Sequence, residues 1–328
     1  MRRNMKQHQH YVPQFYLNNF TKRGNGRLIA YRRNGPPIPG TARGFCGENE
    51  FYSITEADGE VNRSIEEMFS RFETGWSKTL NRLLAVEDPA GLSGGERVDL
   101  AFFVAFMWTR GRRFREHQKN WYDVASRVMF KSIAMTEESL KSQFRDSEQG
   151  LSDNDIGDLR DVILEDRYSI EHTEEYWLKQ SIYMAIQIFP YVLNKQHWQL
   201  AKVEFPNLLI TSDNPVSLLR TPDVPKWRGI GIENAVICLP ISPGYCLLMH
   251  NYENLVEYSN SLGISKVRII NKEQMFYAYR FVFSSIYLAD ISRQFSETLE
   301  GDGERVIVSG PEQLLPKKGT KNAVLKPW

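Results

Sequence analysis

The feature that most constrains the fold is a change in hydrophobic period near residue 195. Between about residues 62 and 193, apolar side chains recur at steps of three and four, as in amphipathic helices. After residue 196 the chain changes to short apolar runs separated by turn sequences such as Ser242-Pro243-Gly244, which indicate strands. A helical block combined with a mostly antiparallel sheet defines an α+β fold.

These patterns predict the individual elements. The expected helices cover about residues 64–84, 96–118, 121–141, 156–166, 170–192 and 271–292. The expected strands cover about residues 27–31, 198–205, 208–211, 234–241, 245–250 and 305–308.

The start of the chain is a second constraint. Gln9–Leu17 is aromatic and reads as extended, and leaving such side chains in water costs roughly 1.5–3 kcal/mol each. We therefore expect this segment to be threaded into the core and to carry His10 with it. The predicted domain is a single unit over residues 1–315, with a helical part at about 62–193 and a sheet part at about 8–55 and 196–310. A helical subdomain inserted into a sheet is the alternative, and residues 316–328 are expected to form a loose tail.

Composition limits the partners. The formal net charge of the 328 residues is +1, so any anion site must be local. No apolar stretch follows the basic start as in a secretory signal, and the longest apolar run, Leu100 to Trp108, is far shorter than the ~20 residues of a membrane span. Cys46, Cys238 and Cys246 have no metal-like spacing, which indicates free thiols in a reducing cytoplasm. A cytoplasmic protein with no membrane partner is expected.

Two carboxylates border the apolar stripe of the first long helix. Glu66 and Glu73 are seven residues apart, so they share a face at a separation of roughly 10 Å, whereas Glu67 points away. One interpretation is a metal or general-base site. The other is that each carboxylate closes the edge of the stripe and pairs with an arginine.

The second long helix turns basic in its second half. Arg110 and Arg113 are three residues apart, which on one helix places them on one face. Arginine suits bidentate binding of carboxylate or phosphate, so the pair could neutralise Glu66 and Glu73 or bind a substrate phosphate. An exposed helix end is the alternative.

Two further polar groups follow or form strands. Thr211-Ser212-Asp213-Asn214-Pro215 comes directly after an apolar run, a place where loop side chains often form sites, although a simple hydrogen-bonded turn fits equally. His8 and His10 share a face on a strand and could ligate a metal, but no third ligand is near in sequence. A histidine that is satisfied by a core hydrogen bond is the alternative.

Several of these segments together resemble the domain-of-unknown-function family 4238. The resemblance rests on QHYVPQFYLNNF at Gln9–Phe20, on Phe51-Tyr52, on Ile65-Glu66 with Glu73, on Arg110, on the Ile210–Pro215 segment and on Leu239–Pro243, and it covers about residues 7–290. Asn18 and Gly111 depart from the family pattern, where Arg and Thr are common. The resemblance implies no activity, but it gathers a set of polar residues: His10, Gln14, Glu66, Glu73, Arg110, Asp213 and Asn214.

Three hypotheses follow. The first is a metal-assisted phosphodiester hydrolase, a nuclease that could serve as a toxin or phage-defence effector acting on nucleic acid or a nucleotide. In it His10, Glu66, Glu73 and Asp213 are catalytic, the three carboxylates hold Mg²⁺ or Mn²⁺, and Gln14, Arg110, Arg113 and Asn214 bind substrate. The second is a non-catalytic sensor for a small anionic ligand such as a nucleotide. The third is a buried polar network that only holds the N-terminal segment in place.

Overall fold

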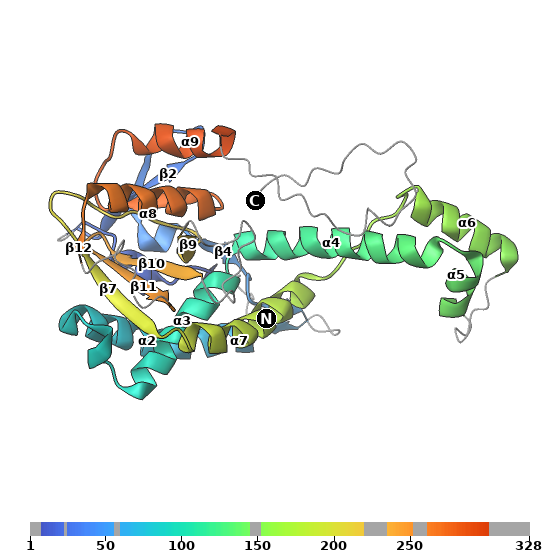
Figure 1. Ribbon diagram of the computed structural model, residues 1–328, viewed down its shortest axis with the longest axis horizontal. Helices are drawn as coiled ribbons and strands as arrows, with labels where there is room; N and C mark the ends of the chain where they lie inside the picture. The colour runs from blue at the N-terminus through green and yellow to red at the C-terminus, as the bar shows by residue number, and fades with distance from the viewer. Residues whose placement is uncertain are drawn as a thin grey trace, which may run out of the picture. The chain divides into compact units, whose positions relative to one another are not determined.

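The computed structural model describes residues 8–22, 25–55, 60–144, 152–219, 235–251 and 261–301. These residues form two compact units. One unit contains the described residues up to Arg115 and from Leu178 onward, and the other contains those from Glu116 to Trp177. Helices and mostly antiparallel strands are segregated along much of the chain (Figure 1), which confirms the expected α+β class.

The helices begin and end as follows: α1 (Gln14–Asn18), α2 (Ser64–Val86), α3 (Gly94–Thr109), α4 (Arg112–Ala134), α5 (Glu137–Phe144), α6 (Asp153–Leu164), α7 (Glu174–Leu193), α8 (Ile264–Tyr277) and α9 (Ile291–Gly301), with short 3₁₀ turns η1 (Ala42–Gly44) and η2 (Pro89–Gly91). Among the described residues, no helix combines the length and the hydrophobicity needed to cross a bilayer.

The strands are β1 (His8–His10), β2 (Arg27–Arg32), β3 (Ile38–Thr41), β4 (Gly47–Asn49), β5 (Ile54–Thr55), β6 (Val61–Asn62), β7 (His197–Val203), β8 (Thr211–Ser212), β9 (Ser217–Leu219), β10 (Val236–Ser242), β11 (Tyr245–His250), β12 (Ser261–Leu262) and β13 (Phe281–Ser284). The expected strand at 305–308 and the expected tail at 316–328 lie outside the described residues.

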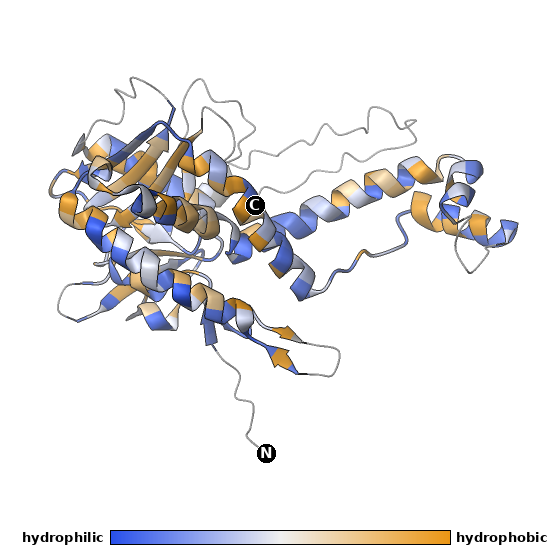
Figure 2. Ribbon diagram, turned by 90° about the horizontal axis from the view of Figure 1, so that it is seen from below, coloured by the Kyte–Doolittle hydropathy of each residue, from blue (hydrophilic) through white to orange (hydrophobic). Residues whose placement is uncertain are grey.

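The largest sheet has the strand order β12-β7-β11-β10-β9, in which only β12 runs parallel to its neighbour. Alternate residues of each strand face opposite sides of this sheet. Leu239 and Leu247 pack into the core that includes α2, α3 and part of α7, whereas Cys238 and Leu248 pack against α8. Figure 1 shows these strands lying between α8 on one side and α3 on the other, and in Figure 2 the strands of the sheet are coloured mostly as hydrophobic.

A second sheet has the order β3-β2-β13-β8, and two smaller pairs, β1-β4 and β5-β6, complete the strands of the described residues. The pair β1-β4 fixes the start of the described chain: Gln9 lies opposite Glu48, and His10 lies opposite Gly47. The strand expected at 208–211 is reduced to the two residues of β8, Thr211–Ser212.

The N-terminal segment is buried, as the sequence predicts. Tyr16, Leu17 and Phe20 are fully buried, and the Tyr16 hydroxyl donates to the Pro240 carbonyl oxygen at 2.6 Å. The segment is not extended throughout, however. It turns at Pro13, which precedes the short helix α1, because the fixed φ of proline suits a helix start.

The helix expected over residues 96–118 is two helices. Helix α3 ends at Thr109 and α4 starts at Arg112. Gly111 lies at the break, where a β-carbon would come within 3.6 Å of the Asn214 side chain. The prediction that Arg110 and Arg113 share one helical face is therefore wrong.

The prediction of one continuous helix over residues 271–292 is also wrong. The chain there forms the end of α8, then strand β13, then the start of α9. Helix α8 ends at Tyr277 because side chains from distant segments bind the backbone beyond it, and no local sequence pattern records those partners.

The unit from Glu116 to Trp177 has a small helical core of its own. Ala134, Leu140, Ile156 and Ile163 are buried together where α4, α5 and α6 meet. Arg127 and Lys131 of α4 both pair with Asp166, which follows α6.

Candidate functional site

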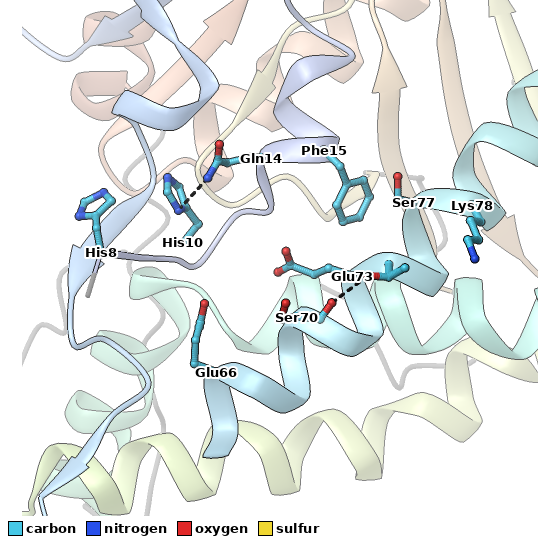
Figure 3. Close-up of a pocket in the computed structure, with 10 residues that line it drawn as sticks. His8, His10, Gln14, Phe15, Glu66, Ser70, Glu73, Ser77 and Lys78 are labelled. Atoms are coloured by element: carbon cyan, nitrogen blue, oxygen red, sulfur yellow. Dashed lines mark hydrogen bonds between the residues drawn. The ribbon is translucent and has the colours of Figure 1, made fainter. Parts of the chain in front are cut away.

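An open polar pocket lies between the N-terminal segment and helix α2 (Figure 3). Its volume is about 570 Å³, which is within the usual range of small-molecule sites. One wall is formed by β1 and α1, and the other by a single face of α2. The lining residues are His8, His10, Gln14, Phe15, Glu66, Ser70, Glu73, Thr74, Ser77 and Lys78.

The period of α2 brings the two predicted carboxylates together. Figure 3 shows Glu66 and Glu73 directed from the helix toward the N-terminal segment, while Glu67 is exposed and does not line the pocket. Phe69, on the neighbouring stripe, is buried in the core and holds the helix in this rotation. The expectation that Glu66 and Glu73 share a face is confirmed.

Glu66 has an unusual electrostatic environment. Partial burial raises the pKa of its carboxyl, the Arg110 charge lowers it in part, and the nearby Glu73 charge raises it further. Within the described part of the chain, Glu66 accepts no hydrogen bond. Its carboxyl is therefore available to a ligand or a proton.

Glu73 is held by a buried arginine. The Arg110 Nη2 donates to Glu73 Oε1 at 2.9 Å and to the backbone carbonyl oxygen of His10 at 2.6 Å, and its Nε donates to the Tyr52 hydroxyl at 3.0 Å. The guanidinium also lies 4.6 Å from the centre of the Phe69 ring, and only 2% of the Arg110 side chain is exposed. Arg110 thus joins three segments beneath the pocket but does not line it.

Both ring nitrogens of His10 have hydrogen-bond partners. Its Nε2 lies 3.1 Å from the Arg43 carbonyl oxygen, and the Gln14 amide donates to its Nδ1 at 3.4 Å. This pairing assigns the proton to Nε2. Burial lowers the pKa of His10, and the neighbouring His8 and Arg110 lower it further against the raising effects of the Arg43 carbonyl and Glu73.

The other predicted residues form a separate buried cluster at the end of α8. The Asp213 carboxyl accepts hydrogen bonds from the backbone N–H groups of Tyr279, Arg280 and Phe281 at 2.7–2.9 Å. Burial raises its pKa to about 6, against the lowering effect of these three bonds. Asp213 is 1% exposed, and it is not among the residues that line the pocket.

Asn214 and Arg113 belong to the same cluster. The Asn214 amide donates to the Tyr277 carbonyl oxygen at 3.1 Å, and Arg113 Nη1 donates to the carbonyl oxygens of Phe276 and Ala278. Burial lowers the pKa of Arg113 to about 10. The structure thus brings His10, Gln14, Glu66 and Glu73 together, places Arg110 beneath them, and places Asp213, Asn214 and Arg113 elsewhere.

Over the described ranges, the structure holds no group of three or more histidine, cysteine, aspartate or glutamate side chains arranged around a metal position. Two carboxylates, Glu66 and Glu73, line the same pocket. They could supply two ligands and leave the remaining positions to water and substrate, as Mg²⁺ sites often do.

Five pocket residues were not predicted from the sequence: Phe15, Ser70, Thr74, Ser77 and Lys78. A heptad-like signal was available, since Ser70 and Ser77 continue the spacing of Glu66 and Glu73 at i, i+4, i+7 and i+11. Phe15 belongs to an aromatic segment whose other members are core residues, so nothing in the sequence distinguishes it.

These features define an α+β protein in which the N-terminal segment and the first long helix enclose a polar pocket. The chain belongs to DUF4238, a family described as "Protein of unknown function", whose family model matches residues 8–286 and confirms the resemblance drawn from the motifs. No curated protein and no solved structure matches the chain.

Proposed function

We propose that the pocket is the active site of a metal-assisted phosphodiester hydrolase, a nuclease. The observation that carries this proposal is that two carboxylates, Glu66 and Glu73, line the same open cavity as a histidine, His10, whose pKa is lowered by burial. Ionisable groups of this kind in one cleft are a frequent sign of catalysis.

The carboxylates favour a bound cation. The Glu73 charge helps to raise the pKa of Glu66, so the two groups are near enough to repel each other. A divalent cation would relieve this repulsion, and it would let an anionic phosphodiester approach an otherwise acidic surface. Glu66 and Glu73 would hold Mg²⁺ or Mn²⁺, which would supply charge stabilisation for the phosphoryl group.

His10 is the proposed proton acceptor. Its Nε2–H is committed to the Arg43 carbonyl oxygen, which leaves the Nδ1 lone pair as the basic position. The Gln14 bond to Nδ1 is long at 3.4 Å and therefore weak, so a water molecule can replace it. The base would then take a proton from the attacking water.

Arg110 enters the proposal as a positioning residue. It is buried and bonded to both walls of the pocket, through Glu73 on α2 and the His10 carbonyl oxygen on β1. It fixes one metal-binding carboxylate and the backbone of the base, in place of the direct phosphate contact expected from the sequence. We place the enzyme in the cytoplasm, because Cys46, Cys238 and Cys246 are free thiols, all of them buried.

The test compares two adjacent glutamates. Purified protein is incubated with single-stranded RNA and DNA, with Mn²⁺ or with chelator. We expect cleavage that requires Mn²⁺ and that Glu66→Gln reduces at least about 100-fold without lowering the melting temperature. The matched control is Glu67→Gln, one residue along the same helix but outside the pocket, which should retain full activity.

Equal activity of the Glu66→Gln and Glu67→Gln variants would remove this proposal. His10→Ala gives an independent check, because it changes the other wall and should also abolish cleavage.

A second function, a non-catalytic sensor of a small anionic ligand, is favoured by one contact. One oxygen of Glu73 is bonded to Arg110, which leaves Glu73 with less capacity to hold a metal. Thermal-shift measurements with nucleotides separate the two. Stabilisation by a nucleotide that is independent of divalent ions, without turnover, would support the sensor.

A further inference from the structure

We propose that the end of the pocket between Phe15 and Lys78 is a nucleotide subsite. In it, the Phe15 ring stacks on a base and the Lys78 ammonium binds the phosphate next to the scissile one. This inference rests on the proposed function, since it names the substrate of the same pocket as a single-stranded oligonucleotide.

The pocket has opposite charges at its two ends. Its wall on α2 extends from Glu66 to Lys78, twelve residues or about 18 Å of helix. The carboxylates occupy the first part, and Lys78 follows Glu73 by five residues, or about 7.5 Å. Figure 3 shows the carboxylates toward one side of the cavity and Ser77 and Lys78 toward the other. A ligand with one anionic group at the metal position and a second further along the helix matches this polarity.

Most of the polar side chains at the Lys78 end have no partner among the described residues. Across the residues that the structure describes, Lys78 forms no ion pair, and the hydroxyls of Ser70 and Ser77 form no hydrogen bond. Only Thr74 is engaged, by donating to the Ser70 carbonyl oxygen at 3.1 Å. A lysine with free neighbouring hydroxyls suits a phosphate and its sugar.

Phe15 offers an aromatic surface on the opposite wall. Its ring packs against Phe103 with the centroids 5.7 Å apart, which fixes it against the core, and the ring also lines the cavity. Figure 3 shows it hanging from α1 toward α2. A fixed aromatic ring that borders a polar cavity is the arrangement on which nucleic-acid bases stack.

Together these groups select the form of the substrate. A base can reach Phe15 only when it is unpaired and splayed out, so a duplex is excluded from the subsite. The second phosphate requires at least two nucleotides. RNA and DNA share this chemistry, and the two are distinguished as separate arms of the test.

The test measures binding apart from cleavage. The Glu66→Gln variant is titrated into a fluorescently labelled hexanucleotide, as RNA, as DNA and as a DNA duplex, with Mn²⁺ present, and anisotropy is recorded. We expect single strands to bind at least tenfold more tightly than the duplex. When each is combined with Glu66→Gln, Phe15→Leu and Lys78→Gln should weaken single-strand binding about tenfold. Phe15→Trp and Lys78→Arg should restore it.

The control variant removes a positive charge of the same helix, α2, that lies outside the pocket. Arg71→Gln removes an exposed cation of α2 that does not line the pocket. In single-strand binding, Lys78→Gln should reduce the slope of log affinity against log salt by about 0.7, the value for one phosphate contact, whereas Arg71→Gln should leave it unchanged.

The outcomes separate the two proposals. If the protein cleaves oligonucleotides but Phe15→Leu and Lys78→Gln bind like the Arg71→Gln control, the subsite is wrong and the hydrolase stands. If those variants weaken binding as expected but the unaltered protein never cleaves, the subsite stands and the hydrolase is wrong. Equal binding of duplex and single strand, or no binding of either, would overturn the subsite.

Discussion

Two polar clusters of this molecule contain similar residue types but use them in opposite ways. In the pocket, Glu66 faces a cavity and accepts no hydrogen bond among the described residues. At the end of α8, the Asp213 carboxyl accepts hydrogen bonds from three backbone N–H groups. A carboxylate near a core is therefore not a functional signal by itself. The two carboxylates differ in whether their oxygens are already bonded to the backbone, as in Asp213, or can still bind a ligand, as in Glu66.

The largest expected effect tests the structural role of the α8 cluster. Asp213→Ala leaves three partly buried backbone N–H donors without their acceptor, each at the lower end of the range of about 1–3 kcal/mol, so we expect a loss of about 4 kcal/mol in the free energy of unfolding. Urea denaturation measures it. Glu66→Gln should change the free energy by less than about 0.5 kcal/mol. A stable but inactive Asp213→Ala protein would make Asp213 a member of the active site and erase the contrast.

The next effect concerns pH. The pKa of Asp213 is about 6 in the folded protein and 3.8 in an ordinary context. Between these values the folded state binds more protons than the unfolded state, so the Asp213 contribution is complete below about pH 4 and is lost as the pH rises to about 6. A difference of about two pH units corresponds to about 3 kcal/mol.

Denaturation of the unaltered protein and of Asp213→Asn, from pH 4 to pH 7, isolates this contribution. The difference between the two unfolding free energies should fall by that amount as the pH rises. Parallel curves would show that Asp213 has an ordinary pKa.

The smallest expected effect sharpens the description of the pocket. Gln14→Ala removes the donor to His10 Nδ1 but leaves the Nε2 contact with Arg43. Because the lost bond is long, we expect cleavage to fall only about fivefold, about 1 kcal/mol, with no change in melting temperature. Steady-state kinetics measures this. A loss as large as that of His10→Ala would instead place Gln14 in direct contact with the reacting groups.

Local patterns predicted much of the fold because they depend on neighbours in sequence. The period of α2 placed Glu66 and Glu73 on one face, and the turn at Ser242–Gly244 placed β10 beside β11. The elements that were mispredicted depend on distant partners. The break at Gly111 lies against Asn214, and the end of α8 is bound by Arg33, Arg113 and Asp213.

The same distinction explains the site. His10, Gln14, Glu66 and Glu73 were selected by motif and by helical spacing, and they meet in the pocket. Asp213 and Asn214 belong to the same family motif set, but the sequence does not show which polar atoms are already used by the backbone. Lys78 was not predicted because it belongs to no motif. Only the pocket that it lines identifies it as a candidate binding residue.

The Arg110 contact with the His10 carbonyl oxygen joins residues one hundred positions apart. On the ribosome, β1 is synthesised first. It can form the hydrogen bond to Arg110 only after the residues at the end of α3 have been synthesised. We therefore expect the nascent chain to have no ligand-binding capacity until translation has passed that point.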